Sequence, residues 1–248
     1  MLNQSVPLLH PALPASAKLL WDSWLVFKSR WHIFAGIAAI AFIGNAIYML
    51  ISAVATVSLI GLPFVKFSLL DILFLLILLA FLLANIILQL WMAVAIIYAV
   101  KNRKERPSLQ DILRQAWPRI TSFTWVGLLV ILCIFGGLLL LVIPGIIFSI
   151  WLCFSLNVFI DEGLKGRQAL KRSRQLTKGK WVKTFWRLLV FLIFAAAIFI
   201  LPDFIAWLTN IGLIGQIGGM AVWIFLMPFT TIYGYLLYEA AKQTSSAN

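Results

Sequence analysis

The chain has 248 residues, of which 63% are apolar and only 11% are charged, whereas an average soluble domain has roughly 45–50% and about 25%. This composition excludes a water-soluble fold and a disordered chain, and two cysteines cannot form a disulfide scaffold. The chain has 20 Lys and Arg but only 8 Asp and Glu. In a membrane protein such an excess is explained first by basic residues in the cytoplasmic loops, and it does not require an acidic partner. We therefore predict an integral membrane protein that binds no nucleic acid, because its basic segments lack the aromatic platforms of such binders.

Uncharged runs locate the membrane spans, since a hydrocarbon layer of about 30 Å takes about 20 apolar residues to cross. Residues 33–60 and 72–100 are single uncharged runs, and residues 120–160 form a run too long for one helix. Within it, Gly136-Gly137 and then Pro144-Gly145 predict a turn, because glycine weakens a helix end and proline is tolerated in a first helical turn. The chain is therefore predicted to cross six times, near 33–60, 72–100, 120–141, 145–160, 184–203 and 214–238.

The basic residues predict the orientation of these spans. Of the 20 Lys and Arg, 19 fall in segments 1–32, 101–119, 161–187 and 241–248, and only Lys66 falls in a connection on the other side. Asp71 and Asp203 are placed at the outer ends of their helices. Because basic residues concentrate in short cytoplasmic loops, both termini and both long loops are predicted to be cytoplasmic.

Similar segments precede the first, third and fifth spans, each with an apolar pair, a small residue and a bulky residue. They are Leu19-Leu20 with Ser23-Trp24, Ile112-Leu113 with Ala116-Trp117, and Ala169-Leu170 with Ser173-Arg174. Their spacing is typical of amphipathic helices at the membrane surface, with Ser16 and Ser108 as N-caps of the first two and Pro118 ending the second. The alternative is that any short loop before a span collects Leu, Trp and Lys.

These segments predict the fold class: six transmembrane helices as three hairpins, each preceded by a cytoplasmic amphipathic helix, in a pseudo-threefold repeat. The units of this single transmembrane domain are placed at 16–100, 107–160 and 164–240, behind a flexible tail of residues 1–15.

The region from Pro144 to Trp186 also resembles a known family. Its motifs are Pro144-Gly145, Phe159-Ile160-Asp161, Ala169-Leu170-Lys171-Arg172-Ser173, Leu176-Thr177-Lys178-Gly179-Lys180-Trp181 and Thr184-Phe185-Trp186, with Tyr238-Glu239 closing the last span. They resemble uncharacterised six-span bacterial inner-membrane proteins related to the membrane domain attached to glycerophosphodiester phosphodiesterases. The resemblance implies a multi-pass protein of the bacterial cytoplasmic membrane, and it implies no biochemical role.

Chemistry for catalysis is sparse in this sequence. The histidines are His10 and His32, and Cys133 and Cys153 lie singly in two different spans without a CxxC partner. A nucleophile with its base, or a metal-ligand cluster, is not apparent at membrane depth. We therefore predict a protein that is not an enzyme and that uses no cofactor or metal.

Two polar sets remain as candidate sites. The first is a basic cluster before the fifth span, a predicted binding site for lipid headgroups: Arg167, Lys171, Arg172, Arg174, Lys178 and Lys180. The second is an intramembrane cluster of Asn45, Asn85 and Gln89, in which the two asparagines of antiparallel neighbours would reach similar depth and hydrogen-bond. The second set is either a structural clamp or a polar pocket, and the sequence favours the clamp.

Two functions remain open at this point. One is a non-enzymatic membrane protein that binds lipids, expected to be anionic, or scaffolds an unidentified protein partner through its basic cytoplasmic face. The alternative is a transporter of a small solute or lipid whose path through the helix bundle is lined by Asn45, Asn85 and Gln89.

Overall fold

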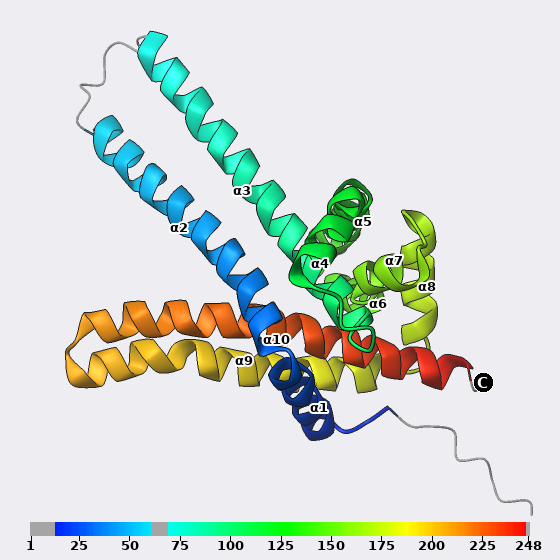
Figure 1. Ribbon diagram of the computed structural model, residues 1–248. Helices are drawn as coiled ribbons and strands as arrows, with labels where there is room; N and C mark the ends of the chain where they lie inside the picture. Colours follow the sequence, from blue (N-terminus) through cyan, green and yellow to red (C-terminus); the bar gives the residue numbers. More distant parts are fainter. Residues whose placement is uncertain (1–12, 61–68, 247–248) are drawn as a thin grey trace, which may run out of the picture.

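The computed structural model describes residues 13–60 and 69–246, which are helical almost throughout and contain no β-strand within these ranges (Figure 1). In chain order the helices are α1 (Ser16–Ser29), α2 (Trp31–Ile60), α3 (Leu69–Lys101), α4 (Leu109–Ala116), the 3₁₀ turn η1 (Trp117–Arg119), α5 (Ile120–Leu140), α6 (Val142–Leu152), α7 (Ser155–Glu162), α8 (Arg167–Thr177), α9 (Trp181–Thr209) and α10 (Gly212–Ser246). The prediction of an all-α protein is confirmed. Lys66 and tail residues 1–12 lie outside the described residues.

Six stretches of helix are long and apolar enough to cross a membrane, as the sequence predicts. The predicted turn within 120–160 falls between α5 and α6, and the fourth crossing is divided at residues 153–154 into α6 and α7. The fifth helix is longer than the predicted 184–203, because Pro202 and Asp203 lie inside α9 and do not end it. In a membrane the backbone of every crossing must hydrogen-bond to itself, so helix is the conformation that these apolar runs adopt.

A helix also lies at each predicted amphipathic position, namely α1 before α2, α4 before α5 and α8 before α9. Ser108 caps α4, since its hydroxyl accepts a hydrogen bond from the Asp111 amide at 3.2 Å. The prediction of Ser16 as a cap is wrong, because the N-cap of α1 is Ala15 and makes no side-chain bond. The second helix does end beside Pro118, as predicted: α4 stops at Ala116, and Pro118 lies in η1, which leads into α5.

The last residues of the predicted tail are held in place rather than free. Arg187 on α9 donates hydrogen bonds from Nε to the carbonyl of Pro14 at 2.8 Å and from Nη2 to that of Leu13 at 2.7 Å. The side chain of Leu13 is itself buried. The flexible segment predicted for residues 1–15 therefore does not extend to residues 13–15.

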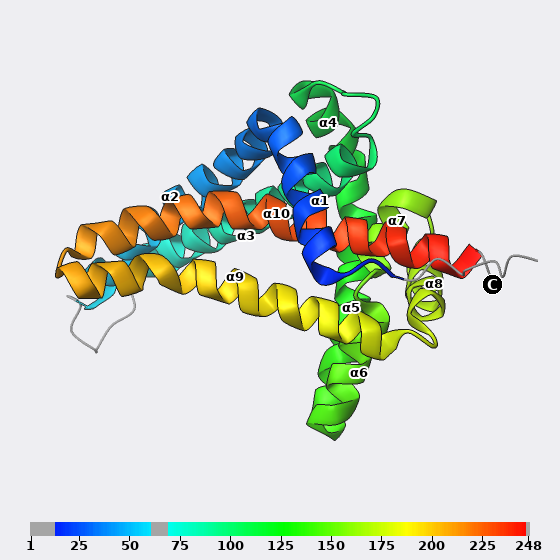
Figure 2. The ribbon, with the colours of Figure 1, turned by 90° about the horizontal axis from the view of Figure 1, so that it is seen from below.

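Three antiparallel hairpins, α2–α3, α5–α6 and α9–α10, point in different directions from a shared region (Figures 1 and 2). We call this region the hub; it consists of α1, α4, α7, α8 and the adjoining ends of the long helices. The crossing in α3 has 30 residues, a length of about 45 Å at about 1.5 Å per residue, against a hydrocarbon layer of about 30 Å. Helices longer than the membrane is thick are accommodated by tilting, which fits the divergence of the hairpins.

The hydrophobic core lies in the hub. The largest fully buried side chains include Phe34 on α2, Met92 on α3, Phe154 beside α7 and Tyr233 on α10. Further out along the hairpins, large apolar side chains are exposed, such as Leu139, which is 74% exposed. Such a surface is stable only against lipid, so the hairpins are suited to the membrane and the hub holds them together.

Glycines permit the close contact at the tip of the α5–α6 hairpin. A Cβ atom added to Gly137 would lie 2.6 Å from the ring of Phe148 and 3.1 Å from the Cα of Gly145. A side chain at either glycine would push the two helices apart. Gly137 and Gly145, one from each of the pairs that predicted the turn, therefore also allow the two helices to pack.

Candidate functional site

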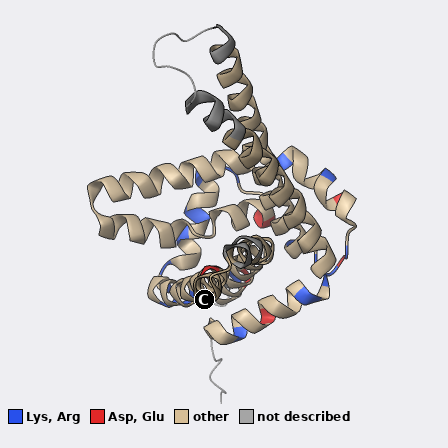
Figure 3. Cartoon of the chain, turned by 90° about the vertical axis from the view of Figure 1, so that its left-hand side faces the viewer, with Lys and Arg blue, Asp and Glu red and all other residues tan. Residues whose placement is uncertain are grey.

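Among the described residues, Lys and Arg are confined to the hub and its edges, whereas Asp71 at the start of α3 and Asp203 in α9 lie toward the hairpin tips. Between residues 31 and 60, 72 and 100, 120 and 160, and 188 and 238, the described hairpins contain no Lys or Arg and a single acidic residue, Asp203 (Figure 3). Burying an unpaired charge in hydrocarbon is costly, so this distribution fixes which end of each hairpin can lie outside the membrane.

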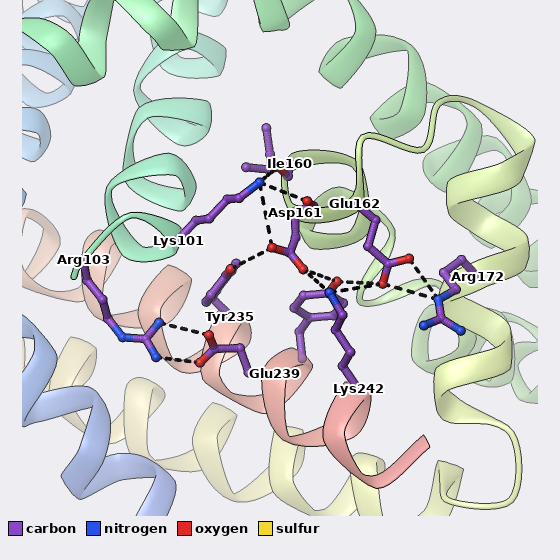
Figure 4. A network of polar contacts seen from close by, with 10 residues as sticks. Lys101, Arg103, Ile160, Asp161, Glu162, Arg172, Tyr235, Glu239 and Lys242 are labelled. Carbon is purple, nitrogen blue, oxygen red and sulfur yellow. Dashed lines mark hydrogen bonds and ion pairs between the residues drawn. The ribbon is translucent and has the colours of Figure 1, made fainter. Parts of the chain in front are cut away.

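A network of polar contacts joins four helices at the centre of the hub (Figure 4). At the end of α7, the Asp161 carboxylate accepts hydrogen bonds from Lys242 Nζ at 2.6 Å and from the hydroxyl of Tyr238 at 2.8 Å, both on α10. The hydroxyl of Tyr235 donates to the other carboxylate oxygen at 3.4 Å. Lys101, the last residue of α3, donates from Nζ to the carbonyls of Ile160 and Asp161, each at 2.9 Å.

Two further ion pairs extend this network. Glu162 accepts a hydrogen bond from Arg172 Nε on α8 at 3.0 Å, and its Oε1 lies 3.0 Å from the Tyr238 hydroxyl, whose single proton it shares with Asp161. Arg103, just after α3, donates two parallel hydrogen bonds to the carboxylate of Glu239, at 3.1 and 2.8 Å. Because Asp161 and Glu162 are only 17% exposed, the pairs are partly shielded from water, and they hold α3, α7, α8 and α10 in one arrangement.

The sequence analysis did not predict this network. Asp161 and Tyr238-Glu239 were named there only among the motifs of the family resemblance. A signal was present nevertheless: Tyr235, Tyr238, Glu239 and Lys242 recur at helical spacing on α10, and Asp161-Glu162 end a membrane span in an otherwise basic segment.

The predicted headgroup cluster lies on and beside α8, and the structure divides it into two groups. Arg167, Lys171, Arg174 and Lys178 are exposed, while Arg172 is bound to Glu162 and Lys180 is partly buried at the start of α9. Arg174 also stacks its guanidinium over the ring of Trp151 at 4.3 Å. Partial burial, with a smaller effect of the nearby Lys183 charge, lowers the pKa of Lys180 from its ordinary value. The cations available to a ligand are therefore the four exposed ones.

The opposite face of α8 attaches it to the membrane helices. Ala169, Ser173 and Leu176 are fully or almost fully buried. The hydroxyl of Ser173 donates to the carbonyl of Trp151 at 2.8 Å and accepts from the amide of Phe154 at 3.2 Å. One side chain thus bridges the break between α6 and α7 and satisfies backbone groups that the break leaves unpaired.

The structure brings the predicted intramembrane cluster together. Asn85 Nδ2 on α3 donates to Asn45 Oδ1 on α2 at 3.4 Å, so the two asparagines lie side by side in the hairpin. Gln89 Nε2 donates to the carbonyl of Ala41 at 2.9 Å and to Asn85 Oδ1 at 3.4 Å. The three amides bind one another and the backbone within a single hairpin, an arrangement that favours the clamp over a polar pocket.

Within the part of the chain that the structure describes, no group of three or more His, Cys, Asp or Glu side chains could hold a metal ion. Comparison with protein-family models, with curated proteins and with solved structures finds no match to this chain. The resemblance to the phosphodiesterase-associated membrane families accordingly stays a prediction, and the geometry of the hub carries the functional interpretation.

Proposed function

We propose that this protein is a non-enzymatic, multi-pass membrane protein that binds the headgroups of acidic phospholipids with the exposed face of α8. The observation that carries the proposal is the distribution of charge around α8, which contains no acidic residue. The acidic residues Asp161, Glu162 and Glu239 form ion pairs in the interior, whereas the cations on the outer face of α8 are left exposed.

Three of these cations have no competing partner. Among the described residues, Arg167, Lys171 and Lys178 form no ion pair with a carboxylate of the protein. A cation near a membrane surface that carries acidic lipids contributes about 1 kcal/mol of attraction. The three together are therefore sufficient to favour an acidic lipid over a zwitterionic one in the layer around the protein.

The position of α8 supports the same function. Its buried face packs under α6 and α7, and the next residues begin the membrane helix α9, so α8 lies beside the end of a membrane crossing. In the orientation predicted by the positive-inside rule, this end faces the cytoplasm. There the exposed cations would meet the acidic headgroups of the inner leaflet.

A charge-matched pair of variants tests this function. The α8 variant changes Arg167→Gln, Lys171→Gln and Lys178→Gln, and the control changes Lys18→Gln, Lys28→Gln and Lys104→Gln, which are exposed cations elsewhere on the hub. Each protein is placed in lipid nanodiscs, and electron paramagnetic resonance compares its association with spin-labelled phosphatidylglycerol and spin-labelled phosphatidylcholine.

We expect the α8 variant to lose the preference for phosphatidylglycerol and the control to keep most of it. High salt should reduce the preference of the unmodified protein, because salt screens exposed charges. An unchanged preference in the α8 variant, or an equal loss in both variants, would contradict a specific role for α8.

A further inference from the structure

An apolar groove runs between α3 and α5 on the outside of the hub. Ile87 and Leu90 of α3 form one wall, Trp125 and Leu128 of α5 form the other, and Trp117 and Pro118 close the end nearest the hub. Its volume of about 790 Å³ falls within the range of about 300–1,000 Å³ that is usual for ligand sites. Because both helices are membrane crossings, the occupant of this groove must be apolar along most of its length.

The closed end of the groove is built rigidly. Trp91 Nε1 donates to the carbonyl of Leu113 at 2.9 Å, and its ring meets the ring of Trp117 edge-on at a centroid distance of 5.0 Å. These contacts attach α3 to α4 and to η1 immediately above the groove. Tryptophan favours the boundary between headgroups and acyl chains, so this end is suited to lie at that boundary.

A polar pocket of about 420 Å³ adjoins the groove at Pro118, which lines both cavities. Its cations are Lys101, Arg119 and Lys165, and its acids are Asp161 and Glu162. The acids and Lys101 belong to the hub network, in which Lys242 and Arg172 also neutralise the carboxylates. Arg119 and Lys165 are therefore the cations that the pocket offers to a ligand.

Arg119 is the better placed of the two. Its guanidinium lies over the ring of Tyr98 at 4.9 Å, and one of its nitrogens donates to the carbonyl of Gln115, so the side chain is held in position. Within residues 13–60 and 69–246 it has no carboxylate partner. The planar guanidinium presents several N–H donors in a geometry that matches a phosphate group.

We propose that the groove and the pocket together form a binding site for one acidic phospholipid. Its phosphate lies on Arg119 with Lys165 beside it, and one acyl chain lies along the groove between α3 and α5. This inference rests on the proposed lipid-binding function and deepens it, since it adds a single defined site to the layer of acidic lipid that α8 attracts.

The test uses the full chain in nanodiscs that contain phosphatidylglycerol, with native mass spectrometry to count the lipid molecules that remain bound after the protein is released. Arg119→Gln removes the guanidinium that would bind the phosphate. Ile87→Trp fills the groove without changing any charge. Lys104→Gln, at an exposed position between α3 and α4 outside the groove and the pocket, is the charge-matched control. Arg119→Lys keeps a cation without the planar donors, and it serves as a second variant if Arg119→Gln does not fold.

We expect the unmodified protein and Lys104→Gln to retain one phosphatidylglycerol. Loss of one charge-assisted hydrogen bond corresponds to about a tenfold decrease in occupancy for Arg119→Gln, and Arg119→Lys should give an intermediate value. Ile87→Trp should decrease occupancy as well. Retention equal to that of the unmodified protein in Arg119→Gln, or in Ile87→Trp, would overturn the inference, and so would a loss in Lys104→Gln as large as that in Arg119→Gln.

The α8 variant with Arg167→Gln, Lys171→Gln and Lys178→Gln separates this inference from the proposed function. If the single site exists, that variant still retains one bound lipid, whatever happens to the surrounding lipid layer. If only the α8 surface binds lipid, the α8 variant loses its preference for phosphatidylglycerol. Arg119→Gln then retains as much lipid as the unmodified protein.

Discussion

Removal of the Asp161 charge should loosen the hub. In Asp161→Asn the amide keeps the size of the side chain and can still accept from Tyr238, but it no longer neutralises Lys242, whose Nζ lies 2.6 Å from the carboxylate. The pair is neither buried nor fully exposed, at 17% for Asp161 and 41% for Lys242. The decrease in the free energy of unfolding should therefore be about 2 kcal/mol. This lies between the roughly 0–1 kcal/mol of a surface ion pair and the roughly 3–5 kcal/mol of a broken buried pair.

The assay is unfolding in mixed micelles by increasing fractions of a denaturing detergent, followed by the fluorescence of the 11 tryptophans. The control is Glu105→Gln, which removes an acidic charge from an exposed position between α3 and α4 and should change the free energy of unfolding by less than about 0.5 kcal/mol. If Asp161→Asn and Glu105→Gln have the same stability, the network does not hold the hub together. A double-mutant cycle with Lys242→Gln should show a coupling of about 0.5–3 kcal/mol, since the two side chains are in contact.

The same unfolding assay checks three further predictions. Gly137→Ala should lower the free energy of unfolding by about 1–3 kcal/mol, because its Cβ would lie 2.6 Å from Phe148. Its control, Gly136→Ala, has nothing within 4 Å of the added Cβ and should be neutral or stabilise the protein by up to about 1 kcal/mol. Equal effects would refute the close packing of α5 and α6. Ser173→Ala should cost about 1–3 kcal/mol by leaving backbone groups at the α6–α7 break unpaired, and Ser149→Ala, whose hydroxyl bonds only within its own helix, should cost much less. Asn85→Leu should cost about 0.6 kcal/mol and at most about 2 kcal/mol, and a stability above that of the unmodified protein would contradict the clamp.

Features that depend on local chemistry could be predicted from the sequence. The six crossings follow from uncharged runs, because a charge in hydrocarbon is costly wherever it occurs along the chain. The cap at Ser108 and the turn between α5 and α6 are local in the same way. The contact between Asn45 and Asn85 was predictable because two antiparallel neighbours joined by a short connection place residues of equal depth side by side.

Features that depend on distant segments could not be predicted. Asp161 and Lys242 are separated by 81 residues, and nothing in their local sequence indicates that α7 and α10 meet. Arg172 looked like a free headgroup ligand until the structure placed Glu162 beside it. The divergence of the hairpins and the break between α6 and α7 likewise result from packing in the hub, which a hydrophobic pattern does not specify.

The end of α9 shows a different limit of prediction from sequence. The single charge of Asp203 suggested a boundary, yet the helix continues to Thr209 with Pro202 inside it. The side chain of Asp203 is exposed near the tip of a hairpin, where a carboxylate costs less than at the centre of a membrane. A charged residue therefore marks the edge of the hydrocarbon rather than the end of a helix.

The central claim is that the hub lies at one membrane surface and the hairpin tips at the other. It is tested most directly by labelling single cysteines with a membrane-impermeant maleimide, in a chain with Cys133→Ser and Cys153→Ala. Lys171→Cys on α8 should react only in inside-out vesicles, and Leu141→Cys at the tip of the α5–α6 hairpin should react only in right-side-out vesicles. Reaction of both positions from the same side, or the reverse pattern, would contradict the account.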